Sequence, residues 1–158
     1  MSSVIERKTI KTEWPIAKIQ EETAKVFARQ FLAAYKALSK FGPEGMKEFD
    51  KNILTFKVDH YKSLGVKTPA DLVKAIAEFE ANVFGSKIEI IGDESKATLK
   101  YDACAVWEAM QKVAKLGPEQ EERMGKHFET CMNDLAREFG LKAEIKHEDP
   151  TCIVTISK

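Results

Sequence analysis

Apolar residues recur every three or four positions through the first half of the chain, which predicts amphipathic helices. Three such segments follow one another, at residues 15–41, 43–64 and 68–84. Each carries a proline in its first turn, at Pro15, Pro43 and Pro69, a position that suits this residue. Thr68 caps the third helix, and Asp71 lies near the positive end of its dipole. The first helix has the longest apolar stripe, which consists of Ile16, Ile19, Thr23, Val26, Phe27, Ala34, Leu38 and Phe41.

After Lys87 the apolar residues alternate with polar ones, which is the period of a β-strand. Two antiparallel hairpins are predicted, one over residues 88–101 and one over residues 143–156. Two further helices separate them, at residues 103–116 and 118–139. The order ααα-ββ-αα-ββ predicts an α+β domain with a four-stranded, mainly antiparallel sheet that helices cover on one face.

The length and the charge balance restrict the classes of function. At 158 residues the chain fits a single domain, residues 1–158, that buries one sizeable core, and residues 1–13 are predicted to form an N-terminal arm. The 25 basic and 25 acidic side chains give zero net charge, which argues against nucleic acid as a partner. No apolar run is long enough to span a bilayer, so we expect no membrane partner.

Cysteine use indicates a reducing compartment. The polar stretch at residues 1–11 has no apolar core of a secretory signal, and three cysteines are an odd number for a disulfide framework. We therefore expect a cytoplasmic protein whose cysteines are thiols or metal ligands.

The last third of the chain holds all three cysteines and two of the three histidines: Cys104, His127, Cys131, His147 and Cys152. His127 and Cys131 are four residues apart on a predicted helix and therefore lie on one side of it. The third histidine, His60, ends an apolar helix face, and we interpret it as structural. Since unpaired cysteines often behave as small buried hydrophobes, a purely structural role is the alternative for each of the three.

Two kinds of chemistry fit this cluster. A metal site built from Cys104, His127, Cys131 and Cys152 would suit zinc or another soft transition metal, with His147 as the alternative nitrogen ligand. A thiol site would instead use Cys104 near the first free amides of a helix that Asp102 caps, where a thiolate is stabilised, with His127 as the base. Catalytic roles are accordingly predicted for Cys104, His127 and Cys131. Phosphate-binding loops, serine nucleophile elbows and His-Glu-x-x-His pairs do not occur in the sequence.

The closing segment Glu148-Asp149-Pro150-Thr151-Cys152-Ile153-Val154-Thr155-Ile156, together with the cysteine after the first hairpin and the cysteine on a late helix, resembles the family of L-2-amino-thiazoline-4-carboxylic acid hydrolase. The layout is also similar to vinyl-4-reductase-like ligand-binding domains. This family resemblance covers about 60 residues and implies a small domain that handles a sulfur- or nitrogen-containing small molecule.

Three functional hypotheses follow. The first is a small-molecule hydrolase that acts on a carbon-nitrogen or carbon-sulfur bond in a Cys/His pocket. The alternative is a non-enzymatic sensor or carrier that binds a metal or small ligand with the same residues. The third is a structural subunit that forms a homodimer through the first two helices. The first two hypotheses predict that Cys104, Cys131 and Cys152 converge with His127 or His147 between the sheet and the helix 118–139.

Overall fold

The computed structural model describes residues 9–148 and 150–158. It confirms the α+β class and the predicted order of elements. Its helices and strands are α1 (Ile16–Leu38), the short 3-10 helix η1 (Ser39–Phe41), α2 (Pro43–Ser63), α3 (Pro69–Phe79), the π-helical turn η2 (Glu80–Phe84), β1 (Lys87–Gly92), β2 (Lys96–Ala103), α4 (Ala105–Ala114), α5 (Pro118–Glu138), β3 (Lys142–Glu148) and β4 (Thr151–Ser157). Residues 9–13 of the predicted arm form no helix or strand, and residues 1–8 lie outside the described residues.

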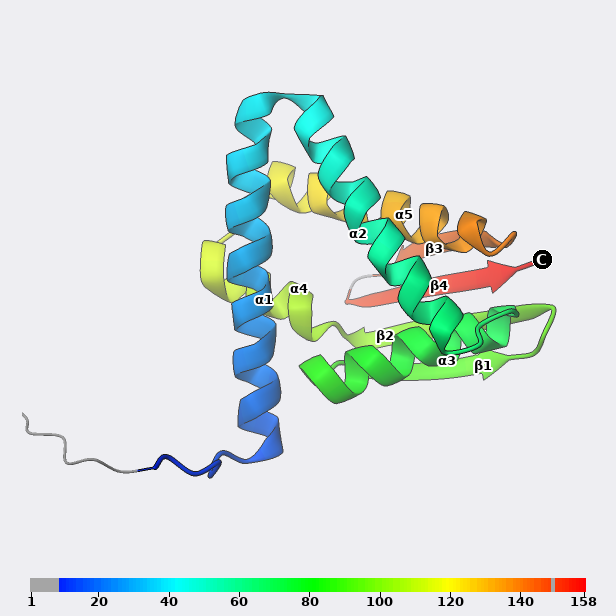
Figure 1. Ribbon diagram of the computed structural model, residues 1–158, viewed down its shortest axis with the longest axis horizontal. Coiled ribbons are helices and arrows are strands. Elements are labelled where there is room, and N and C mark those ends of the chain that lie inside the picture. The colour runs from blue at the N-terminus through cyan, green and yellow to red at the C-terminus, as the bar shows by residue number, and fades with distance from the viewer. Residues whose placement is uncertain (1–8, 149) are drawn as a thin grey trace, which may run out of the picture.

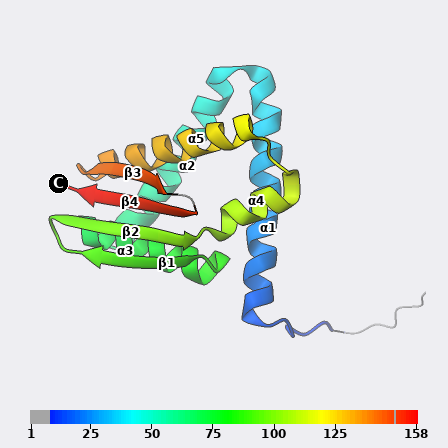
Figure 2. The same ribbon diagram turned by 180° about the vertical axis from the view of Figure 1, so that it is seen from behind.

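The four strands form one antiparallel sheet in the order β1-β2-β4-β3. Helix α3 packs on β1, β2 and β4, and α5 packs on β3, so that one face of the sheet is covered (Figures 1 and 2). Helix α2 lies against α5, whereas α1 packs on α4 and η2 beyond the end of the sheet. The predicted covering of one sheet face is therefore confirmed.

Local sequence signals fix two of the element boundaries. Thr68 accepts a hydrogen bond from the Asp71 amide, and the Asp71 carboxylate accepts one from the Thr68 amide, which completes a capping box for α3. In the first hairpin, Asp93 Oδ1 accepts hydrogen bonds from the Ser95 and Lys96 amides. Gly92 precedes it with φ 145°, and any Cβ there would lie 2.3 Å from the Ala97 Cα. Only glycine therefore fits at this turn.

Two buried clusters replace the single core that we predicted from the length. The first lies between the sheet and helices α2, α3 and α5, and the second lies between α1, η2, α4 and the start of α5. Leu72 and Leu99 are among the largest fully buried side chains of the first cluster, and Ala24 and Ala28 of α1 are buried in the second. The sheet and the α1–α4 pair thus bury separate apolar surfaces.

The apolar stripe predicted for α1 is largely exposed. Its buried residues Ala24 and Ala28 are small and allow α1 to approach α4 closely. The larger side chains of the stripe that remain exposed are Ile16, Ile19, Val26 and Phe27, with Phe41 in η1. Within the described residues, no helix is both long and apolar enough to cross a lipid bilayer.

Candidate functional site

Two helices bring three potential metal ligands together. His127 and Cys131 lie one turn apart on α5, as their spacing predicts, and Asp50 on α2 faces them. One ligand atom from each of the three residues lies within 4.8 Å of the other two. Among the residues that the structure describes, this is the only group of three or more His, Cys, Asp or Glu side chains with such a spacing. We call Asp50, His127 and Cys131 the α2–α5 site.

The distances centre on one ring nitrogen of His127. Its Nε2 lies 2.9 Å from Oδ1 of Asp50 and 3.6 Å from Sγ of Cys131. The sulfur is also 3.9 Å from Nδ1. If Sγ lay on the line of one ring N–H bond, its distance to the other ring nitrogen would be much longer. The two distances are nearly equal, so the thiol lies beside the ring. Asp50, not Cys131, is therefore the directional hydrogen-bond partner of Nε2.

The donor set fits a zinc ion. Tetrahedral zinc with bonds of about 2.0 to 2.3 Å separates its ligand atoms by about 3.3 to 3.6 Å. The Sγ to Nε2 distance of 3.6 Å matches this spacing, but the sulfur lies beside the ring and would have to move toward the Nε2 lone pair to share an ion with it. The Nε2 to Oδ1 distance of 2.9 Å is that of a hydrogen bond and would need to widen by a few tenths of an ångström. A sulfur, an imidazole nitrogen and a carboxylate oxygen are all donors that zinc accepts in proteins.

Aromatic side chains from α1 surround the histidine. The ring of Phe31 lies 5.8 Å and that of Tyr35 6.4 Å from the His127 ring, measured between centroids. The side chains of His127 and Asp50 are 21% and 35% exposed, so the site is sheltered but open to solvent. The contact with Cys131 and, to a smaller extent, the hydrogen bond with Asp50 raise the pKa of His127 to about 9 against the opposing effect of burial.

Cys104 lies elsewhere, and its environment contradicts the predicted thiolate. Strand β2 continues to Ala103, so Cys104 itself, not Asp102, is the N-cap of α4. Burial raises the pKa of its thiol to about 11, although the backbone N–H of Trp107 at the start of the helix acts in the opposite direction. Desolvation here outweighs the helix terminus, because the thiol packs against the first buried cluster.

Cys152 and His147 are direct cross-strand partners, as the hairpin pattern predicts. His147 Nε2 lies 2.8 Å from Oε1 of Glu129 on α5. Burial and then the nearby charge of Glu129 raise the pKa of Cys152 to about 11. The strands continue one residue beyond this pair, to Glu148 and Thr151, and Asp149 of the predicted turn lies outside the described residues.

The predicted set Cys104, His127, Cys131 and Cys152 is therefore not assembled as one metal site. Cys104 and Cys152 pack against the first buried cluster, whereas Cys131 belongs to neither cluster and faces Asp50. Of the five clustered residues, the α2–α5 site keeps His127 and Cys131 and adds Asp50. His147, the alternative nitrogen ligand, pairs with Glu129 instead.

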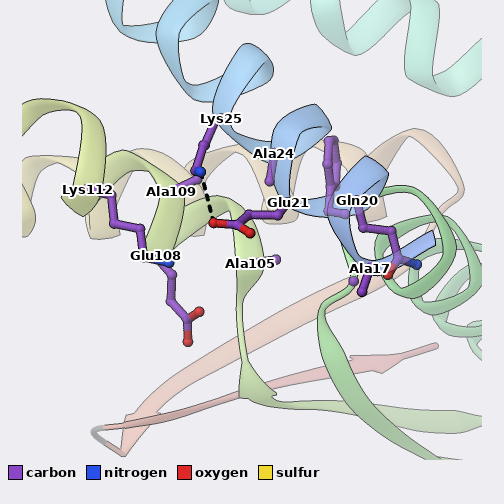
Figure 3. A pocket seen from close by; sticks show the side chains of 11 residues that line it. Ala17, Gln20, Glu21, Ala24, Lys25, Ala105, Glu108, Ala109 and Lys112 are labelled. Carbon is purple, nitrogen blue, oxygen red and sulfur yellow. Dashed lines mark ion pairs between the residues drawn. The ribbon is translucent and has the colours of Figure 1, made fainter. Parts of the chain in front are cut away.

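A shallow hollow of about 230 Å³ lies between α1 and α4, away from these residues. Figure 3 shows its charged lining, in which Lys25 reaches Glu21 at 2.8 Å while Glu108 and Lys112 project from α4. Ligand pockets usually measure about 300 to 1,000 Å³ and are mainly apolar. The hollow is smaller than that, and its charges are already paired in part, so the α2–α5 site remains the better candidate.

No protein-family model and no curated protein matches this chain. The family resemblance carried by the cysteines and the closing hairpin accordingly stays a hypothesis. No local pattern in the sequence points to Asp50, because it is one of many charged residues on its helix. Only the packing of α2 against α5 identifies it.

Proposed function

We propose that this protein is a zinc-dependent hydrolase of small molecules and that Asp50, His127 and Cys131 hold the ion. The observation that carries the proposal is the convergence of three different donor atoms within 4.8 Å. Structural zinc sites usually have four protein ligands, whereas catalytic sites have three and keep one position for water. A three-ligand set therefore favours catalysis over a purely structural ion.

The surrounding side chains support this chemistry. Zinc held by three protein groups makes its bound water a nucleophile near neutral pH. Phe31 and Tyr35 beside His127 would exclude bulk water from one side of the site, and the partly exposed Asp50 leaves another side accessible to a substrate. The substrate class we propose is a small polar molecule with a carbon-nitrogen or carbon-sulfur bond, as the family resemblance implies. Three free thiols suit a reducing cytoplasm.

A second candidate is a metal-free thiol hydrolase that uses the same residues. Cys131 would be the nucleophile, His127 the base and Asp50 the group that orients the ring, an order of contacts known from cysteine hydrolases. The 2.9 Å contact between Asp50 and His127 favours this candidate, because it already fixes the imidazole without an ion. The position of the sulfur beside the ring disfavours it, since proton transfer needs an in-line contact.

Cobalt binding separates the two candidates. Apo-protein titrated with Co²⁺ should take up one equivalent and develop a thiolate-to-cobalt charge-transfer band that zinc abolishes. Cys131→Ser should remove this band, and Asp50→Asn and His127→Ala should weaken binding at least tenfold. The matched controls Cys152→Ser and His147→Ala change the other thiol and imidazole pair and should bind like the wild type. Cobalt binding without the band, or a band that survives Cys131→Ser, would refute the metal site.

Assays of substrate hydrolysis test whether the protein is an enzyme. Hydrolysis of a thiazoline-type or carbamoyl-cysteine-type substrate should disappear with a chelator and return with zinc. Hydrolysis that resists the chelator but needs Cys131 would instead establish the thiol hydrolase. A protein that binds zinc at this site and hydrolyses neither substrate class would be the non-enzymatic sensor or carrier of the second hypothesis.

A further inference from the structure

Large apolar side chains are exposed on the two helices of the α1–α2 corner. Successive members are three or seven residues apart, except for one adjacent pair on α1, and therefore lie on one side of each helix. We call them the α1–α2 apolar surface, which consists of Ile16, Ile19, Val26 and Phe27 on α1 and Ile53 and Phe56 on α2. Ile16 is 74% and Phe56 73% exposed. Single exposed apolar residues are ordinary, whereas apolar side chains gathered on one side of a helix can mark a contact surface.

The divergence of the two helices explains the exposure. They meet at Gly42 and separate along their length (Figure 1). Near the corner the rings of Phe31 and Phe49 lie 6.3 Å apart and join the helices. Farther along α2 the side chains of Ile53 and Phe56 are 39% and 73% exposed. Each helix thus presents an apolar side that its neighbour does not cover.

The amount of apolar surface matches a protein interface. With roughly 150 to 250 Å² for a large side chain, the six residues expose on the order of 600 Å². Monomers rarely expose a contiguous patch larger than a few hundred Å², and a standard interface buries about 800 Å² on each partner. The surface is therefore large enough to form most of one side of a stable interface.

We propose that the α1–α2 apolar surface is the interface of a twofold-symmetric homodimer, in which α1 of each copy packs between α1 and α2 of the other. Helix α1 of one copy would contact α1 and α2 of the other copy. The twofold axis repeats this contact, and the assembly closes with two copies. The formal net charge is zero, so two copies do not repel each other. This interface goes beyond the proposed hydrolase and does not depend on the metal.

The oligomeric state of the full chain tests the proposal. Light scattering at micromolar concentration should give twice the monomer mass of 17.8 kDa. Val26→Glu and Phe56→Glu place a charge in the interface and should each raise the dimer dissociation constant roughly 30-fold or more. Because both residues are partly or largely exposed, circular dichroism should show folded variants. The matched control is Ile91→Glu on β1, which is 78% exposed and should leave the dimer unchanged.

Mixing variants tests the arrangement. Val26→Glu and Phe56→Lys copies should each be monomeric alone and should form a dimer when mixed. In the mixed pair one α1-to-α2 contact is wild type and the other pairs opposite charges. A monomeric wild type, or a dimer that survives both single variants, would overturn the interface. A dimer broken only by Ile91→Glu would place it at the β1 edge, and failure of the mixed pair to associate would refute the α1-to-α2 packing. Cobalt binding by the monomeric variants shows separately whether the metal site is intact.

Discussion

The thiol of Cys104 provides a test of which force controls a cysteine at a helix start. The sequence pattern favours a reactive thiolate there, because the first amides of a helix stabilise negative charge. The structure instead places Cys104 against the first buried cluster, where desolvation disfavours the charged form. We predict that burial prevails and that Cys104 is a protonated, unreactive thiol at neutral pH.

The size of the effect follows from the two pKa values. Burial raises the pKa of Cys104 from 9.0 to about 11, which leaves about 100-fold less thiolate at neutral pH and corresponds to about 3 kcal/mol. Below pH 9 the folded and unfolded states both hold the proton, so the free energy of unfolding does not change. Between pH 9 and about 11 the unfolded chain loses the proton first, and stability falls with rising pH.

Two measurements check this prediction. Urea unfolding of the wild type and of Cys104→Ser under reducing conditions should show that the wild type loses about 2 kcal/mol more than the variant between pH 9 and about 11. Tyr61 and Cys152, whose pKa values burial raises to about 12 and about 11, are present in both proteins and cancel in the difference. Alkylation at pH 8, followed by mass spectrometry, should modify Cys104 about 100-fold more slowly than in the unfolded chain.

Either of two results would refute the reasoning. Parallel pH curves for the wild type and Cys104→Ser would mean that the pKa of Cys104 is the same in the folded and unfolded states. Alkylation of the folded protein at the rate of the unfolded chain would mean that the helix start controls the thiol after all. Cys104 would then return as a candidate nucleophile.

Two further predictions concern stability. Leu72→Ala should lower the free energy of unfolding by about 3 kcal/mol, because Leu72 is fully buried, whereas Leu64→Ala at a 59% exposed position should change it by less than about 0.5 kcal/mol; equal losses in urea unfolding would contradict the assignment of the core. Burial raises the pKa of Glu80 above its usual 4.5 despite the hydrogen bond from Ser86, so the contribution of Glu80 to stability should fall as pH rises above about 4.5. Glu80→Gln should be more stable than the wild type at pH 7 and lose that advantage toward pH 4, and a constant difference in urea unfolding across this range would exclude a role for the ionised carboxylate.

Features set by neighbouring residues could be predicted from the sequence. The capping box at Thr68 and Asp71 fixes the start of α3 through side chains three residues apart. The alternation of β3 and β4 around a short turn determines both the faces of the strands and the pairing of His147 with Cys152. The His127 to Cys131 spacing likewise places both side chains on one side of α5.

Features that depend on which elements pack together could not be predicted from the sequence. Periodicity identifies α1 as amphipathic, but the side that packs on α4 is lined by the small residues Ala24 and Ala28, and the larger apolar side stays exposed. Asp50 is 77 residues from His127, and no local pattern distinguishes it from other acidic residues of α2. The predicted cap Asp102 is wrong because β2 runs to Ala103, which makes Cys104 the cap of α4.

Helix α5 explains why the predicted cluster divides into two groups. Phe128 and Leu135 occupy the side that packs against the first buried cluster, which leaves two flanks for polar side chains. Residues two apart on a helix differ by about 200° in direction, so Cys131 and Glu129 point to opposite flanks. His127 and Cys131 therefore meet Asp50 on α2, whereas Glu129 meets His147 on β3. A single pocket containing Cys131 and Cys152 would require the apolar side of α5 to turn away from the sheet, at the expense of the core that holds this helix in place.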